Sequence, residues 1–188
     1  DFSLSRGLGD VYKRQFLEGA EKVIAIERDS RAIQFLEHIV TATDGHLTLL
    51  EKDAMRQPIW KMGNAPRKIV ANLPYNIATA LLLRWLAHAN AFVSLTLMFQ
   101  KEVAERLVAQ PGDKAYGRLS ILTQWLCNAE LKFDVPPQAF IPPPKIISSV
   151  VHLIPRPRPL YDCRKEDLET TTTIAFGQRR KMLRASFK

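Results

Sequence analysis

Short apolar runs alternate with segments of helical periodicity along most of the chain. Val23 to Ile26 is a β-branched run closed by Glu27, and Ser30 to Ile39 repeats apolar residues at helical spacing. The alternation continues through strands predicted at 46–50, 68–71 and 92–99 and helices predicted at 78–89, 101–109 and 119–127. Such alternation predicts βαβ units, and hence an α/β fold with a mainly parallel, doubly wound sheet.

The pattern changes after Asn128. A short strand is predicted at 133–135 and a last strand at 146–154, with prolines at 136–137 and 142–144 around Phe140 in between. Because proline cannot donate a ladder hydrogen bond, this stretch is predicted to be a rigid loop. The strand at 92–99 is apolar almost throughout, so we expect both of its faces to be covered.

The C-terminal part reads as a linker followed by helices. Prolines alternate with arginines over 155–159, which is typical of a linker. Helices are predicted at 162–176 and 178–187, and they contain too few residues to close a core of their own.

Composition narrows the class of protein. A chain of 188 residues, 46% of them hydrophobic, fits one packed domain, and the lack of an apolar run of eighteen residues excludes a membrane span. Of the net charge of +8, nine Lys or Arg and four acids place +5 in residues 156–188 and leave +3 for the rest. A basic tail on a nearly neutral body predicts that the body carries the chemistry and the tail helps to hold a polyanion.

The two cysteines point to a reducing compartment. Cys127 and Cys163 lie far apart in unlike surroundings, without a Cys-x-x-Cys motif or clustered histidines. This pattern disfavours a disulfide framework and a zinc site. Residues 1–15 also lack the apolar core of a signal peptide, so we expect a cytoplasmic protein.

Polar residues follow three of the predicted strands, where α/β sheets bind their ligands. Glu27 can take the hydroxyls of a ribose, or it is an exposed acid paired with Arg28 or Arg31. Asp53 can accept the amino group of an adenine, or it caps a helix. Asn72 completes the set. Hydrolysis by paired carboxylates is disfavoured because no histidine joins them at a third strand end.

The segment Asn72-Leu-Pro-Tyr75 carries the most specific chemistry. The amide of Asn72 and the carbonyl of Pro74, for which we expect no neighbouring donor, can accept the two hydrogens of an exocyclic amino group. Tyr75 offers a ring face to a planar base. Two such acceptors suit alkylation of an aromatic amine, because they stabilise the developing positive charge. The alternative is a turn that ends a strand and starts a helix.

Five segments together resemble the ribosomal RNA adenine dimethyltransferase family, most of all its small-subunit branch. They occur in the family's order and are Asn72–Tyr75, Met98–Leu107, Tyr116–Ser120, Phe140–Val151 and Ala175–Arg184. The resemblance runs from about residue 16 to residue 184. It implies a Rossmann-like methyltransferase sheet with the start of a small C-terminal helical lobe.

The resemblance implies a role for each candidate residue. S-adenosylmethionine would be bound by Glu27, Asp53, Ala54 and Asn72. Asn72, Pro74 and Tyr75 would receive the target N6, and Phe140 would stack on the flipped base. The residues implied to contact RNA phosphates, which are otherwise a solvated helical face, are Lys145, Arg179, Arg180, Lys181 and Arg184.

The implied function is transfer of two methyl groups to N6 of adjacent adenosines near the 3′ end of 16S rRNA. The implied partner is this rRNA within the small ribosomal subunit, and we expect a monomer that needs no metal and no membrane. Two alternatives stay open, a non-catalytic RNA-binding assembly factor and a large-subunit rRNA methyltransferase of the macrolide-resistance type. A DNA adenine methyltransferase is disfavoured because no segment reads as a DNA target-recognition domain.

The N-terminal segment departs from the family pattern. Gly7 and Gly9 stand where the end of a glycine-rich cofactor loop belongs, but Ser3 to Arg6 replace the strand before it. We therefore expect residues 1–15 to be foreign or disordered. Residues 16–155 would form a catalytic domain without its first strand, and residues 156–188 a linker and truncated RNA-binding lobe.

Overall fold

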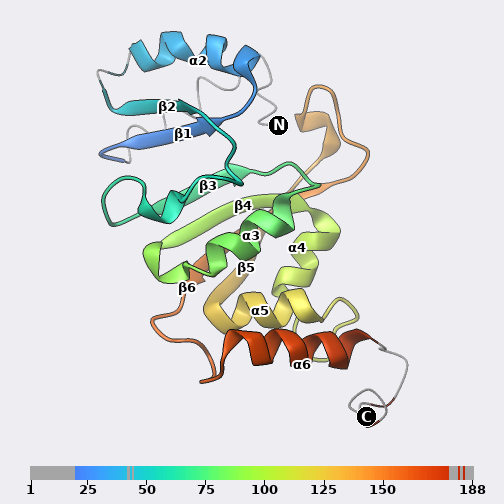
Figure 1. Cartoon of the computed structure of the whole chain (residues 1–188). Coiled ribbons are helices and arrows are strands. Elements are labelled where there is room, and N and C mark those ends of the chain that lie inside the picture. The colour runs from blue at the N-terminus through green and yellow to red at the C-terminus, as the bar shows by residue number, and fades with distance from the viewer. Residues whose placement is uncertain (1–19, 42, 44, 178–181, 183, 185–188) are drawn as a thin grey trace.

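The computed structural model describes residues 20–41, 43, 45–177, 182 and 184 of the chain. Figure 1 shows its strands and helices. The strands are β1 (Val23–Glu27), β2 (Leu47–Glu51), β3 (Lys68–Asn72), β4 (Ser94–Gln100), β5 (Cys127–Val135) and β6 (Ser148–Pro155). The α-helices are α2 (Ser30–Thr41), α3 (Ala78–Leu86), α4 (Lys101–Val108), α5 (Arg118–Leu126) and α6 (Lys165–Gly177). Short 3-10 helices occupy Ile59–Lys61, Ala89–Ala91 and Pro137–Ala139.

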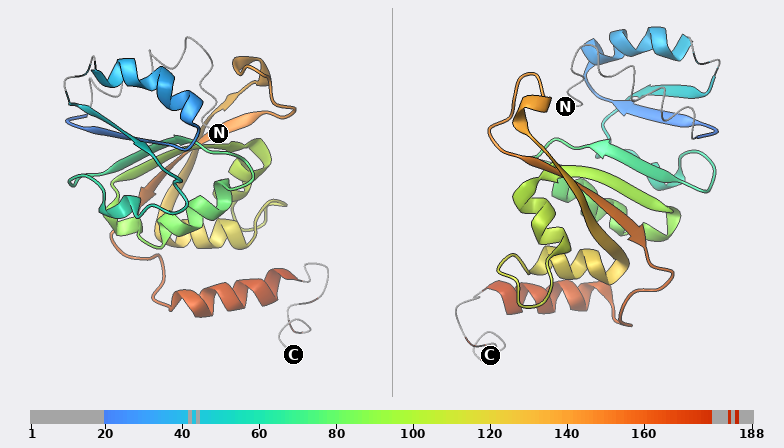
Figure 2. Two further views of the ribbon diagram at one scale, coloured as in Figure 1. Left: turned by 45° about the horizontal axis from the view of Figure 1, so that its top comes forward. Right: turned by 180° about the vertical axis from the view of Figure 1, so that it is seen from behind.

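The strands form two sheets. β1 and β2 pair in parallel, and the second sheet has the order β3-β4-β6-β5. Figure 1 and the right view of Figure 2 place β1, β2 and α2 beside β3, on the side away from β4. In the part of the chain that the structure describes, no strand pairs with the facing edges of β1 and β3.

The prediction of a mainly parallel sheet holds for the pairs β1–β2 and β3–β4 and fails at β6. β3 and β4 are parallel, as expected for strands joined by the crossover helix α3, but β6 runs antiparallel to both β4 and β5. The reason is the proline-rich loop, residues 136–147, which returns the chain directly from β5 to β6. The short strand predicted at 133–135 is the end of the nine-residue β5.

A bulge interrupts the pairing of β5 with β6. Leu131 lies opposite Val151 and Phe133 lies opposite Val150, so Lys132 is an extra residue on β5. From the bulge onward, Asp134 lies opposite Ser149. A bulge of this kind also sharpens the local twist of the hairpin.

The main core lies on one face of the larger sheet. Leu97 and Phe99 of β4 and Leu153 of β6 are fully buried there against Leu82 of α3 and Leu107 of α4. Along β4 buried residues alternate with half-buried ones, so among the described residues one face of this strand is fully covered and the other, which we expected to be covered as well, is covered only in part. On the opposite face of this sheet, Val70 of β3 is 49% exposed.

A second, smaller core holds β1 and β2 against α2. Its buried members are Leu36 of α2 and Leu47 of β2, with Val23, Ala25 and Leu49 packed around them. Side chains of β1 are mostly half-buried. Among the side chains that the structure describes, fewer buried apolar residues support β1 and β2 than support the larger sheet.

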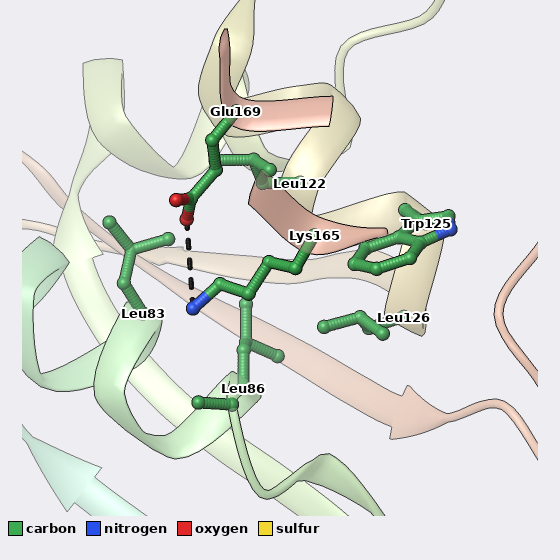
Figure 3. Close-up of a pocket in the computed structure, with 8 residues that line it drawn as sticks. Leu83, Leu86, Leu122, Trp125, Leu126, Lys165 and Glu169 are labelled. Carbon is green, nitrogen blue, oxygen red and sulfur yellow. Dashed lines mark ion pairs between the residues drawn. The ribbon is translucent and has the colours of Figure 1, made fainter. Parts of the chain in front are cut away.

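The C-terminal helix packs on the main body. The backbone N–H groups of Arg156 and Leu160 donate to the carbonyls of Leu126 and Trp125 at the end of α5, so the predicted linker is bonded to that helix. Figure 3 shows the hollow where α6 meets α3 and α5, with a 3.6 Å ion pair between Lys165 and Glu169 of α6. The other lining residues are Leu83, Leu86, Ala87, Leu122, Trp125 and Leu126.

Three further predictions concern the ends of helices. The helix predicted at 78–89 ends earlier, at Leu86, and the helix predicted at 162–176 begins later, at Lys165. The helix predicted at 178–187 lies outside the described residues, apart from Met182 and Arg184. None of the described helices is both long enough and apolar enough to cross a membrane.

The two cysteines are both free thiols, one buried and one exposed. Burial raises the pKa of the Cys127 thiol to about 12. Since the thiolate is the reactive form, Cys127 behaves as a small core residue.

Candidate functional site

The carboxyl ends of β1, β2, β3 and β4 lie at one edge of the fold. Figure 1 shows this edge, and the loop between β5 and β6 extends to the same side. Glu27 and Glu51 are register partners at the ends of β1 and β2, and Asn72 and Met98 are partners near the ends of β3 and β4. The candidate residues that sequence reasoning selected from separate strands are therefore brought to one edge.

Glu27 is a buried acid at the end of β1. Its side chain is 6% exposed, and its Oε1 accepts hydrogen bonds from the backbone N–H groups of Arg28 (2.6 Å) and Asp29 (2.8 Å). The alternative of an exposed acid paired with Arg28 or Arg31 is wrong, since Glu27 is buried and Arg31 pairs with Asp29 at 2.8 Å. The backbone thus fixes one carboxylate oxygen, and a carboxylate has a second oxygen that can accept from a ligand.

Asp53 lies two residues beyond β2, next to the end of β1. The backbone N–H of Lys52 donates to the Glu27 carbonyl at 2.8 Å, which ties the two strand ends together. Asp53 Oδ1 accepts from the N–H of Met55 at 2.9 Å and caps the turn that follows. Ala54 is half-buried against the main core. The capping role considered for Asp53 is therefore real, although the element it caps is a turn and not a helix.

The segment from Asn72 to Tyr75 joins β3 to α3. Leu73 is buried in the main core, and Asn72, Pro74 and Tyr75 are half-buried. The Pro74 carbonyl accepts a hydrogen bond from the N–H of Ile77 at 3.1 Å, so the expectation that it has no neighbouring donor was wrong. A carbonyl oxygen has two lone pairs, so one acceptor position remains for a ligand.

The loop between β5 and β6 carries Phe140 and Lys145. Phe140 is half-buried just after the 3-10 turn Pro137–Ala139, and its N–H donates to the Pro137 carbonyl at 3.1 Å. Lys145 is exposed. The loop therefore presents an aromatic ring and a cation on the side where the strands end.

Polar contacts that sequence reasoning missed hold the base of this loop. Lys101 Nζ and Asp134 Oδ2 are 2.6 Å apart, and the Ser149 hydroxyl donates to Asp134 Oδ1 at 2.6 Å. Hydrogen bonds from Lys101 and Ser149 lower the pKa of Asp134, and the same carboxylate raises the pKa of Lys101. On the neighbouring residue, the Ser148 hydroxyl shares a hydrogen bond of 2.7 Å with the Tyr75 hydroxyl.

The remaining candidate residues are only partly described. Arg184 is exposed, whereas Arg179, Arg180 and Lys181 lie outside the described residues. Gly7 and Gly9, and with them the whole segment 1–15, also lie outside. Among the residues described, no group of three or more His, Cys, Asp or Glu could hold a metal ion.

Comparison with protein families and curated sequences gives consistent matches. A model of the family described as ribosomal RNA adenine dimethylase matches residues 7–188. The ribosomal RNA small subunit methyltransferase A of Rhodospirillum rubrum is 54% identical over 182 residues, which cover 97% of this chain and 63% of the relative. The protein of the same name from Paramagnetospirillum magneticum is 53% identical, with 97% and 65% covered. The chain thus spans just under two thirds of the length of these relatives.

Solved structures give the same picture for the fold. A dimethyladenosine transferase from Plasmodium falciparum superposes with a TM-score of 0.79 at 32% identity, over 96% of this chain and 64% of that one. The 23S rRNA methyltransferase ErmE reaches a TM-score of 0.76 at 23% identity, over 97% and 71%, and at this identity the likeness shows the fold alone. The predicted Rossmann-like methyltransferase fold is confirmed.

Proposed function

Because the chain belongs to the ribosomal RNA adenine dimethylase family, as its motifs predicted, we propose that it serves the reaction of that family. The reaction is transfer of two methyl groups from S-adenosylmethionine to N6 of adjacent adenosines near the 3′ end of 16S rRNA, during biogenesis of the small ribosomal subunit. The observation that carries the proposal is the segment Asn72–Tyr75, which lies at the end of β3 on the edge shared with the buried Glu27.

Four residues would hold the cofactor. The second carboxylate oxygen of Glu27 suits the hydroxyls of a ribose, and Asp53 with Ala54 suits an adenine. The hydrogen bond from Lys52 to the Glu27 carbonyl ties the two strand ends together, so one nucleoside could contact both. Asn72 lies at the end of the neighbouring strand β3. This set of buried and half-buried acceptors fits a nucleoside. When bound, S-adenosylmethionine would supply a methyl group from its sulfonium, which would leave as a neutral thioether.

The acceptor side would be formed by Asn72, Pro74, Tyr75 and Phe140. The Asn72 amide oxygen and the free lone pair of the Pro74 carbonyl would accept hydrogen bonds from the two N6 hydrogens and stabilise the positive charge that develops on nitrogen, until the methylated nitrogen releases a proton to solvent. Tyr75 and Phe140 would stack against the adenine ring after it leaves the RNA stack. Holding the nitrogen in line with the donor would supply much of the rate enhancement. The proposed scheme is a direct transfer, with no covalent enzyme intermediate and no metal ion.

Contact with rRNA would involve the loop and the C-terminal tail. Lys145 is exposed on the loop beside Phe140, and Arg184 is exposed in the tail, with Arg179, Arg180 and Lys181 near it in sequence. Cations of this kind bind phosphates and position the RNA, without reading its sequence. We propose that the protein acts as a monomer in the cytoplasm, where bacterial ribosomal subunits assemble.

The small subunit is the favoured target. Relatives that are 53–54% identical carry small-subunit names, whereas the likeness to a 23S rRNA methyltransferase is a likeness of fold. The segment Phe140–Ser148, with its three prolines followed by Lys145, also favours the small-subunit branch.

The test combines cofactor binding with methyl transfer. Calorimetry with S-adenosylmethionine should show saturable binding, and incubation with unmethylated small subunits should place two methyl groups on each of two adjacent adenosines. Methyl groups found on large-subunit rRNA would instead favour the macrolide-resistance type. Binding of rRNA without cofactor binding or transfer would favour a non-catalytic assembly factor.

A further inference from the structure

Two successive serines of β6 are both fully buried. Ser148 and Ser149 are each 0% exposed. Successive side chains of a strand point to opposite faces of the sheet, so the two hydroxyls face different surroundings. A buried hydroxyl without a partner is costly, and here each hydroxyl has a specific side-chain partner, Tyr75 for Ser148 and Asp134 for Ser149.

The bond between Tyr75 and Ser148 bridges two strands that are not neighbours. In the sheet order, β4 lies between β3 and β6. β4 extends two residues beyond the partner of Asn72, to Gln100, which is the register partner of Ser148. The Tyr75 side chain therefore reaches past the end of β3, and its hydroxyl meets Ser148 at 2.7 Å.

Ser148 is the first residue of β6, directly after the β5–β6 loop, and this point is firmly held. The preceding residue, Ile147, accepts a hydrogen bond at its carbonyl from the backbone N–H of Lys101 at 3.0 Å. The Lys101 ammonium also pairs with Asp134 of β5, and Asp134 binds Ser149. Lys101 thus braces both strands at the base of the loop. The Tyr75 hydroxyl is bonded to this braced base, and Phe140 is carried by the same loop.

We propose that Ser148 is a positioning residue for methyl transfer, whose hydroxyl holds the Tyr75 ring at a set place relative to Phe140. This inference rests on the proposed function. Without the bond, the ring remains but its tip is no longer tied to the loop. Because transfer depends on a well-aligned nitrogen, a small error in the stacking surface lowers the rate more than it lowers binding.

The test removes each hydroxyl separately and then together. Ser148→Ala and Tyr75→Phe should each lower kcat by roughly tenfold, with the cofactor Kd and the KM for the small subunit within about threefold, as for loss of one hydrogen bond. The double variant should be no slower than the worse single variant, because both changes remove the same bond. Unchanged kcat in both single variants, or losses that multiply, would overturn the inference.

A matched control comes from a side-chain hydrogen bond that joins two neighbouring strands. The Thr96 hydroxyl and His152 Nδ1 are 2.9 Å apart and join β4 to β6, away from the loop. Thr96→Val should leave kcat unchanged. An equal loss of kcat in this variant would reduce Ser148 to a purely structural role.

A second measurement separates this inference from the proposed function. The chain has four tyrosines, and Tyr75→Phe identifies the ring signal of Tyr75 in spectra of ring-labelled protein. Ring flipping of Tyr75 should be faster in the Ser148→Ala variant than in the wild-type protein. If the unchanged protein transfers no methyl groups, the proposed function fails, whereas normal kcat in both variants of an active protein defeats this inference alone. Should Ser148→Ala not fold, Tyr75→Phe still decides, because Tyr75 is half-buried.

Discussion

The candidate cofactor residues and the candidate acceptor residues lie on parts of the fold that are stabilised differently. Glu27 and Asp53 extend from a two-stranded sheet whose core, among the residues that the structure describes, has two buried members, Leu36 and Leu47. Asn72 and Tyr75 extend from a four-stranded sheet with a core shared by β4, β6, α3 and α4. The first pair is held by local backbone bonds, whereas Tyr75 is held by a partner 73 residues away.

This difference suggests a division of tasks between the two halves. A turn that binds its own carboxylate can open and close around a nucleoside at small cost, because few other contacts change. Alignment of a reacting nitrogen needs rigid support, which long-range packing supplies. The acceptor half should therefore be the more stable part, and the cofactor half the part that responds to its ligand.

The largest expected effect is on stability, and it compares the core of the acceptor half with the core of the cofactor half. Phe99→Ala should lower the free energy of unfolding by about 3–5 kcal/mol, because it empties a fully buried site in the main core. Leu47→Ala should cost about 2 kcal/mol, since the smaller core can collapse around the gap. Urea unfolding of both variants measures this, with the half-exposed Val93→Ala as control. A larger loss for Leu47→Ala would contradict the comparison.

The next effect concerns the acceptor half alone. Asn72→Ala should lower methyl transfer by about 10²–10³-fold while the cofactor Kd changes only a few fold, because the lost contact acts in the transition state. The exposed Asn76, four residues along the same segment, gives the control Asn76→Ala, which should transfer normally. Transfer by Asn72→Ala at the unchanged rate would refute the role assigned to Asn72.

The matching change in the cofactor half should act on affinity. Glu27→Gln keeps the shape of the side chain but removes the charge that strengthens its hydrogen bonds, so the cofactor Kd should rise about tenfold to a hundredfold. At saturating cofactor, kcat should stay near its original value. Glu51→Gln is the control, since Glu51 is exposed and lies directly opposite Glu27. Equal weakening in both variants would argue against a specific site at Glu27.

The smallest effect is a pH dependence at the loop base. The pKa of Asp134 is lowered by its hydrogen bonds from Lys101 and Ser149. Its stabilising effect is therefore complete above the ordinary Asp pKa of about 3.9 and is lost as the pH falls through the lower value of the folded protein. Urea unfolding of the unchanged protein and of Asp134→Asn should differ at pH 6 and converge at the acid end. A difference that persists unchanged at pH 2.5 would contradict this account.

Much of the fold was predictable because most strands and helices carry a clear period. β1, β3 and α4 were predicted to within a residue, since apolar runs and helical spacing are local signals. The first part of β5 was missed because Glu130 and Lys132 interrupt the apolar pattern and the preceding helix α5 passes into β5 without a loop. The order β4-β6-β5 depends on pairing between distant segments, which no local period reveals.

The same limit separates the site residues that were predicted from those that were missed. Glu27 and Asn72 were found because a polar residue directly after an apolar strand is conspicuous. The role of Ser148 depends on a contact with Tyr75 across the sheet. The available signal was modest, two adjacent serines inside the otherwise apolar run 146–151. Such a pair within a predicted strand requires two buried hydrogen bonds, and that requirement identifies it.

The bulge at Lys132 shifts the pairing of β5 with β6 by one residue, and the contacts of Asp134 at the base of the loop depend on this shift. Upstream of it, Leu131 lies opposite Val151, and a regular ladder would continue by placing Asp134 opposite Ser148. The single extra residue moves Asp134 opposite Ser149 and onto the face that Lys101 reaches. If the same sequence paired without the bulge, the side chains of β5 between Lys132 and the loop would lie on the opposite faces of the sheet. The brace at the base of the loop therefore depends on how Lys132 is accommodated in the strand pairing, as well as on the identities of Lys101, Asp134 and Ser149.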